Sequence, residues 1–61
     1  MLKINDRVAV KSFTHNGIDH SNRTGTVTKV MRFRKVSVFL DRSDGLPSRE
    51  FDFKESNLRK I

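Results

Sequence analysis

Residues Lys35–Asp41 read KVSVFLD, and this stretch decides the fold class. Its apolar residues Val36, Val38 and Leu40 are two apart, which turns them to the same side of an extended chain. A helix would need apolar residues three or four apart. The stretch therefore predicts a β-strand with one buried face. The residues turned to its other face are Ser37 and Phe39.

Four other segments show strand patterns, and helical spacing is scarce along the chain. They read RVAVKSF at 7–13, GTVTKVMRF at 25–33, SREFDF at 48–53 and NLRKI at 57–61. Val27 and Val30 are three apart, so a regular strand cannot turn both inward and we expect a bulge. Alternation also puts Ala9 on the face opposite its two valine neighbours. The residues expected to be buried are Val8, Val10, Val27, Val36, Val38, Leu40, Phe51, Phe53, Leu58 and Ile61.

The connections between these segments contain turn residues. Asn16-Gly17 lies in the long first connection, and Asp44-Gly45 lies between the third and fourth strand segments. Both dipeptides tolerate the positive φ that tight turns need. RFRK at 32–35 predicts a hairpin tip, and FKESN at 53–57 suits one turn of 3₁₀ helix.

Five short strands, a long first loop and one 3₁₀ turn before the last strand resemble the small SH3-like barrels. Gly25-Thr26-Val27 is similar to the Gly-x-Val signature of KOW domains in ribosomal proteins and transcription factors. Residues 36–41 and 53–58 resemble the electron-transport accessory barrels, a family that includes a small peripheral component of photosystem I. The first resemblance implies RNA contact, and the second implies docking on a protein complex. We expect an all-β, five-stranded SH3-like barrel that forms a single domain over residues 1–61.

Charge is unevenly distributed along the chain. The sequence has 13 Lys and Arg against 7 Asp and Glu, a net charge of +6. Residues 1–40 hold eight basic and two acidic side chains, so all of the net charge arises there, while residues 41–61 balance five against five. Clustered positive charge favours a polyanionic partner, because binding releases condensed counterions.

KVMRFRK, residues 29–35, places four cations around Phe33 with no carboxylate among them. Repulsion makes such a tip costly unless an anion meets it or nearby carboxylates neutralise it. The available carboxylates are Asp41, Asp44, Glu50 and Asp52. An exposed Phe among cations also suits base stacking. The residues predicted to bind nucleic acid are Lys11, Arg23, Lys29, Arg32, Phe33, Arg34 and Lys35. The alternative is a solvated hairpin that binds nothing.

Catalytic and metal-binding motifs are scarce. The chain has no Cys, and it contains no Gly-x-Ser-x-Gly, phosphate-binding Gly-rich or His-Glu-x-x-His pattern. His15 and His20, with Asp19, lie on the first loop, but a metal site would need at least one more ligand. We expect these to be exposed loop residues, and we expect no enzyme activity, cofactor or metal.

No segment approaches the roughly 20 apolar residues that cross a bilayer, and the first ten residues do not resemble a signal peptide. The absence of Cys is consistent with a reducing compartment. We therefore expect a cytoplasmic protein without a membrane span.

Two hypotheses for function follow. The first is a small basic module that contacts the phosphates of DNA or RNA with weak sequence preference, since no residue pattern marks base readout. The alternative is a protein interaction adaptor, such as a bacterial or phage accessory protein, whose basic face docks an acidic partner in an electron-transport, polymerase or ribosome complex.

Overall fold

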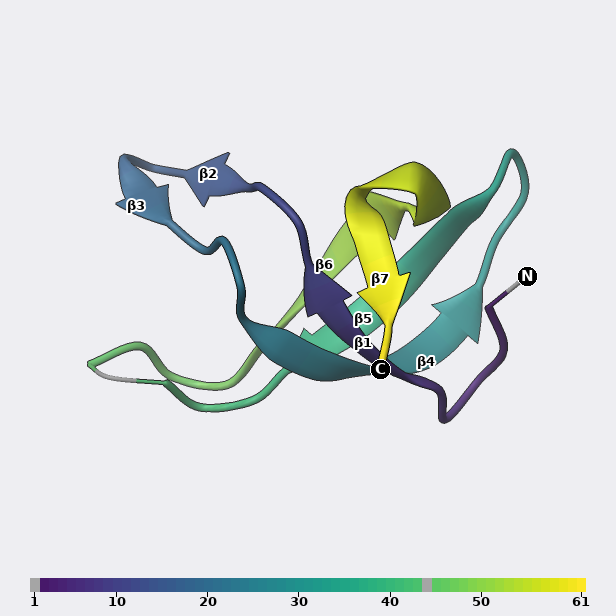
Figure 1. The fold of residues 1–61 in the computed structure, drawn as a ribbon, viewed down its shortest axis with the longest axis horizontal. Helices are drawn as coiled ribbons and strands as arrows, with labels where there is room; N and C mark the ends of the chain where they lie inside the picture. The colour runs from purple at the N-terminus through teal and green to yellow at the C-terminus, as the bar shows by residue number, and fades with distance from the viewer. Residues whose placement is uncertain (1, 44) are drawn as a thin grey trace.

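Seven strands and one 3₁₀ turn form the regular structure of residues 2–43 and 45–61, the part of the chain that the computed structural model describes (Figure 1). In chain order they are β1 (Arg7–Val10), β2 (Thr14–His15), β3 (Ile18–Asp19), β4 (Thr24–Val30), β5 (Lys35–Leu40), β6 (Arg49–Lys54), η1 (Glu55–Asn57) and β7 (Leu58–Lys60). The all-β prediction is confirmed. In the described residues, no helix is long and apolar enough to span a membrane.

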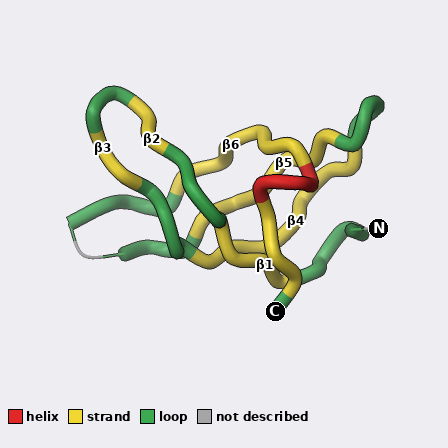
Figure 2. Tube along the Cα trace, turned by 45° about the horizontal axis from the view of Figure 1, so that its top comes forward, coloured by secondary structure: helices red, strands yellow, loops and turns green. Residues whose placement is uncertain are grey.

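Five strands make one antiparallel sheet in the order β6-β5-β4-β1-β7. The 3₁₀ turn η1 carries the chain from the end of β6 to β7, at the other edge of the sheet (Figure 2). Its position before the last strand is as predicted. The first loop is more ordered than expected, because β2 and β3 form a separate two-stranded hairpin. Asn16 and Gly17 make its turn with φ of 51° and 77°.

The core lies on one face of the sheet. It consists of Val8, Val10, Val27, Val36, Val38, Leu40, Phe53 and Leu58, all of which were expected to be buried. Phe51 is only partly buried, and Phe13 packs beside it at the edge of this cluster. The prediction for Ile61 is wrong, because this residue follows β7 at the chain end and is 67% exposed.

The predicted bulge is present in β4. Val27 pairs with Val38, but Lys29 pairs with Ser37, so Thr28 is an extra residue on the β4 side. The shift brings Val30 opposite buried Val36. Val30 nevertheless stays 45% exposed, since it is the last residue of its strand.

Two residues expected on the outer face are buried. Ser37 lies on the interior strand β5, and its hydroxyl donates to Asp52 Oδ1 at 2.6 Å. Ala9 lies between Thr24 of β4 and Arg59 of β7, whose larger side chains flank it. Alternation predicts to which face of the sheet a side chain points, but it does not predict whether other side chains cover that face.

Gly25 allows β4 and β5 to approach closely. It is buried opposite Leu40, and a Cβ at this position would lie 2.7 Å from both Phe39 O and Val38 Cγ1. Contacts this short do not occur, so a side chain here would force the two strands apart. The Gly-Thr-Val motif thus has a packing role in this sheet. The second predicted turn was Asp44-Gly45. The backbone φ of Gly45 is 70°, and Asp44 lies outside the described residues.

We predict that Leu40→Ala lowers the free energy of unfolding by about 2–5 kcal/mol, measured by urea denaturation. Leu40 has no exposed surface and is among the largest fully buried side chains of the described core. Ile61→Ala is the control and should change stability by less than about 0.5 kcal/mol, because Ile61 is mostly exposed. Equal effects of the two changes would contradict this assignment of the core.

Candidate nucleic-acid interface

The β4–β5 hairpin ends in the predicted tight turn. Lys35 N donates to Arg32 O at 3.3 Å, and Met31 N donates to Lys35 O at 2.8 Å. The two central residues, Phe33 and Arg34, have φ of 60° and 57°. A positive φ at both central positions is what a type I′ hairpin turn requires, and Asn-Gly is the sequence that usually supplies it.

Phe33 is therefore both strained and exposed. A side chain in the left-handed region costs roughly 1–2 kcal/mol, and an aromatic residue is seldom found there. Phe33 recovers nothing by burial, since 92% of it is exposed. Backbone strain of this kind is frequent at functional sites. The ring gives the hairpin tip an open aromatic face.

The cations at this end of the sheet have no carboxylate partner among residues 2–43 and 45–61. Within the described residues the two ion pairs are Arg7–Asp41 and Lys60–Asp6, and neither contains a cation from this end of the sheet. In addition, β5 and β6 place Lys35 directly opposite Lys54, a like-charge pair that destabilises a sheet. The exposed basic residues at this end are Lys29, Arg32, Arg34, Lys35 and Lys54. We call these five residues with Phe33 the basic tip.

One carboxylate lies beside the basic tip. Glu55 belongs to η1, and its backbone N–H donates to Arg34 O at 2.8 Å, which fastens η1 to the turn. Its side chain accepts a hydrogen bond from Leu2 N at 3.0 Å. An open groove runs between the turn and η1, lined by Phe33, Arg34, Lys54, Glu55 and Ser56. Two cations of the basic tip, Arg34 and Lys54, thus line a groove that holds one carboxylate.

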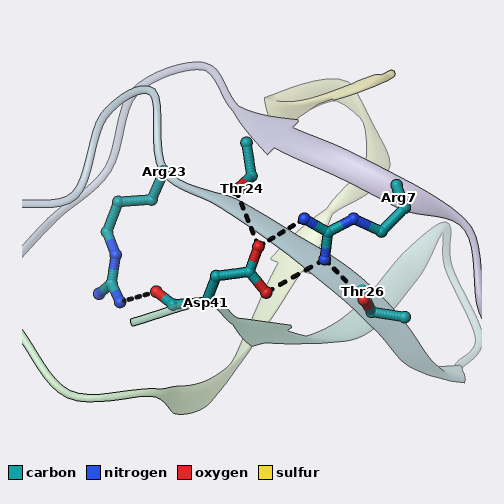
Figure 3. A network of polar contacts seen from close by, with 5 residues as sticks. All are labelled: Arg7, Arg23, Thr24, Thr26 and Asp41. Atoms are coloured by element: carbon teal, nitrogen blue, oxygen red, sulfur yellow. Dashed lines mark hydrogen bonds and ion pairs between the residues drawn. The ribbon is translucent and has the colours of Figure 1, made fainter. Parts of the chain in front are cut away.

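The carboxylate of Asp41 lies at the other end of β5, in a polar network (Figure 3). It forms a bidentate ion pair with Arg7, whose Nη1 also donates to Thr26 Oγ1 at 2.8 Å. The hydroxyl of Thr24 donates to the same carboxylate at 3.0 Å. The bonds from Arg7 and Thr24 hold the pKa of Asp41 below its usual value, against the opposing effect of partial burial. Asp41 is thus engaged away from the basic tip.

The other candidate neutralisers are also engaged. Glu50 Oε2 accepts from Thr28 Oγ1 at 2.7 Å, and Asp52 accepts from Ser37. Asp44 lies outside the described residues. The described carboxylates that could have neutralised the tip are hydrogen-bonded to hydroxyl groups or paired with Arg7 on the sheet.

The structure gathers five of the seven predicted site residues on one hairpin: Lys29, Arg32, Phe33, Arg34 and Lys35. Lys11 is exposed, but it follows β1 near the beginning of β4, whereas the basic tip follows the end of β4. Arg23 is only 6% exposed, and its guanidinium donates to Asp41 O, Pro47 O and His20 Nδ1. We therefore leave Arg23 and Lys11 out of the proposed interface. Phe39, which the sequence turned outward, is partly exposed opposite Glu50, away from the tip.

Lys54 is the residue that sequence reasoning missed. It ends the FDFK strand, and only the pairing of β5 with β6 brings it opposite Lys35. The strand lengths could have predicted this position. When two antiparallel strands of equal length pair along their whole length, the first residue of one lies opposite the last residue of the other.

The expectation of exposed loop histidines is wrong for His20, which is buried. Arg23 Nη1 lies 2.9 Å from His20 Nδ1. A guanidinium can only donate, so Nδ1 accepts and the ring is neutral with its proton on Nε2. His15 is partly exposed and stacks on Phe13. In the described part of the chain, no three His, Cys, Asp or Glu side chains form a group that could hold a metal ion.

Comparison of the chain with protein-family models, with curated proteins and with solved structures found no match. The site is therefore interpreted from its own geometry.

Burial of His20 generates a prediction about pH. Desolvation, then the charge of Arg23, lower the pKa of His20, with smaller effects from His15, Arg49 and the opposing charge of Asp19. The unfolded chain then binds more protons than the folded chain as pH falls below about 6.5, the ordinary His value, so the free energy of unfolding should fall there.

Urea denaturation of the wild type and of His20→Asn at pH 7.5, 6.5, 5.5 and 5.0 measures this effect. Asn presents an acceptor near the position of Nδ1 and does not titrate, so its stability should vary less over this range. If the free energies of unfolding of the two proteins changed with pH in parallel, the His20 ring would not be the source of the pH dependence.

Proposed function

We propose that this protein is a binding module that holds the phosphate backbone of nucleic acid on the basic tip and has no chemistry of its own. One observation carries the proposal: five exposed cations without a carboxylate partner in the described part of the chain lie at the end of the sheet whose turn carries a strained, exposed Phe33. Assembling such a surface costs free energy through charge repulsion and backbone strain. Phosphate would remove the first cost, and a stacked base would use the aromatic face.

We further propose that the fold is an SH3-like barrel. The strand order β6-β5-β4-β1-β7, the long loop after β1 and the 3₁₀ turn before β7 support this assignment. The resemblance of the chain to KOW domains is in keeping with a nucleic-acid partner. No base-reading side chains lie among the tip residues beyond Arg and Lys, so we propose weak sequence preference.

The three turn cations test the phosphate contacts. Replacing Arg32, Arg34 and Lys35 with Ala removes up to three counterion releases, so the slope of log K against log salt should decrease by about 2.7 on duplex DNA. Fluorescence anisotropy titrations at several salt concentrations measure the slope. The melting temperature should not fall, because the lost charges repel one another.

A matched triple variant removes the same charge elsewhere. Arg42, Arg59 and Lys60 are exposed residues away from the tip, and their change to Ala should leave the slope nearly unchanged. If the slope of log K against log salt changed equally in the two triple variants, net charge alone would explain the salt dependence. This outcome would contradict the proposed site. If the wild type binds neither DNA nor RNA at low salt, the acidic-protein alternative replaces the proposal.

Phe33→Gly tests the stacking of a base on the ring and the backbone strain at this position separately. Glycine adopts the positive φ of this position freely, so stability should rise by up to about 1 kcal/mol. Loss of the ring should weaken single-stranded binding by about 1–3 kcal/mol with little change in salt slope. The measurements are thermal unfolding and anisotropy with a labelled single strand. Unchanged single-strand affinity would remove Phe33 from the interface.

A further inference from the structure

A small cavity lies at the end of the sheet opposite the basic tip. It is partly open to solvent and is lined by residues of the β2–β3 hairpin, by Leu46 and Pro47, and by the beginning of β6. The hairpin and the segment that leads into β6 extend from the same end of the sheet (Figure 1). The volume of the cavity is about 80 Å³, roughly the space of two or three water molecules. A carboxylate or a single phosphate group can occupy such a space, whereas a nucleobase cannot.

Arg23 forms the buried wall of this cavity. Its Nη2 donates to Asp41 O at 2.6 Å and to Pro47 O at 3.2 Å, and its Nη1 donates to His20 Nδ1. All three acceptors are neutral. Its Nε is buried and has no partner among the described residues. A buried cation normally has a paired anion, and an unsatisfied buried donor is rare.

A second guanidinium lines the same cavity. Arg49 lies over the ring of Phe51, 5.1 Å from its centroid. Both Arg49 and Arg23 act on His20 to disfavour its protonation, which places two positive charges near the cavity. None of the lining residues is Asp or Glu. Leu46 and Pro47 add apolar surface, and their low polarity strengthens the field of the two arginines.

We propose that this cavity binds one compact oxyanion, a carboxylate or a single phosphate group, between Arg23 and Arg49. Arginine is suited to this role because its planar fork matches the oxygens of both groups. The bound oxygens would accept from the guanidinium of Arg49 and from Nη1 of Arg23, which has a second N–H besides the one that faces His20 Nδ1. The site shares no residue with the basic tip, so it adds to the proposed function and does not depend on it.

NMR of the arginine side chains tests the proposal directly. The Nε–Hε correlations of Arg23 and Arg49 are followed in the ¹⁵N-labelled protein during titration with acetate, phosphate or chloride at constant ionic strength. Saturable shifts of both signals with acetate or phosphate are expected, and chloride should cause much smaller shifts. Tighter binding of acetate identifies a carboxylate as the natural group, and tighter binding of phosphate identifies a phosphate. Equal responses to chloride, or no saturable shift, overturn the proposal and leave a water-filled cavity.

Two variants separate the site from net charge. Arg49→Gln should weaken oxyanion affinity roughly tenfold or more, as the loss of a charged hydrogen bond does. Arg42→Gln removes the same charge from an exposed residue outside the cavity lining and should change affinity less than about twofold. Equal weakening in both variants overturns the assignment. The triple variant of the basic tip should retain full oxyanion affinity, so failure of one proposed site leaves the other testable.

Discussion

The pairing of β4 with β5 is the constraint on which the rest of the structure depends. These strands lie at the centre of the sheet, and Gly25 lets them approach more closely than any side chain would permit. The bulge after Val27 then resets the register, so that the hairpin closes at Phe33 and Arg34. The same pairing therefore fixes the hydrophobic core on one face and the position of the basic tip at one end.

Charges of opposite sign are separated by this arrangement. The described carboxylates of β6 and of Asp41, the residue after β5, accept hydrogen bonds from Thr, Ser and Arg7 along the sheet. The turn cations have no such partners in the described chain, and Lys35 even faces Lys54. This separation is costly for a domain of 61 residues, which has little stability to lose.

Alternation and turn residues were sufficient to predict the five strands of the main sheet, the hairpin tip, the 3₁₀ turn and most of the core, but not the β2–β3 hairpin. Burial of charged and polar residues was not predictable in this way. Arg23 and His20 are buried because the β2–β3 hairpin and residues 46–47 close over them, a tertiary event with no local signal. Lys54 joins the candidate site because the register of β5 and β6 places it opposite Lys35. This register depends on where the two strands begin and end. The failures thus concern contacts between segments far apart in sequence, and the successes concern local geometry.

Arginine has two opposite roles in this chain, and the difference lies in what its donors meet. Arg23 is buried because two backbone carbonyls and a neutral His replace most of its hydration, although its Nε stays open. Arg32 and Arg34 make no hydrogen bond through their side chains within the described chain, and they remain in water. The proposed anion site combines this buried guanidinium with Arg49 in a small pocket, where desolvation makes poor hydrogen-bond geometry expensive. Exposed guanidinium groups on a turn select by charge density instead and tolerate varied geometry. Arginine thus contributes to both proposed sites, the small anion pocket at one end of β4 and the basic tip at the other.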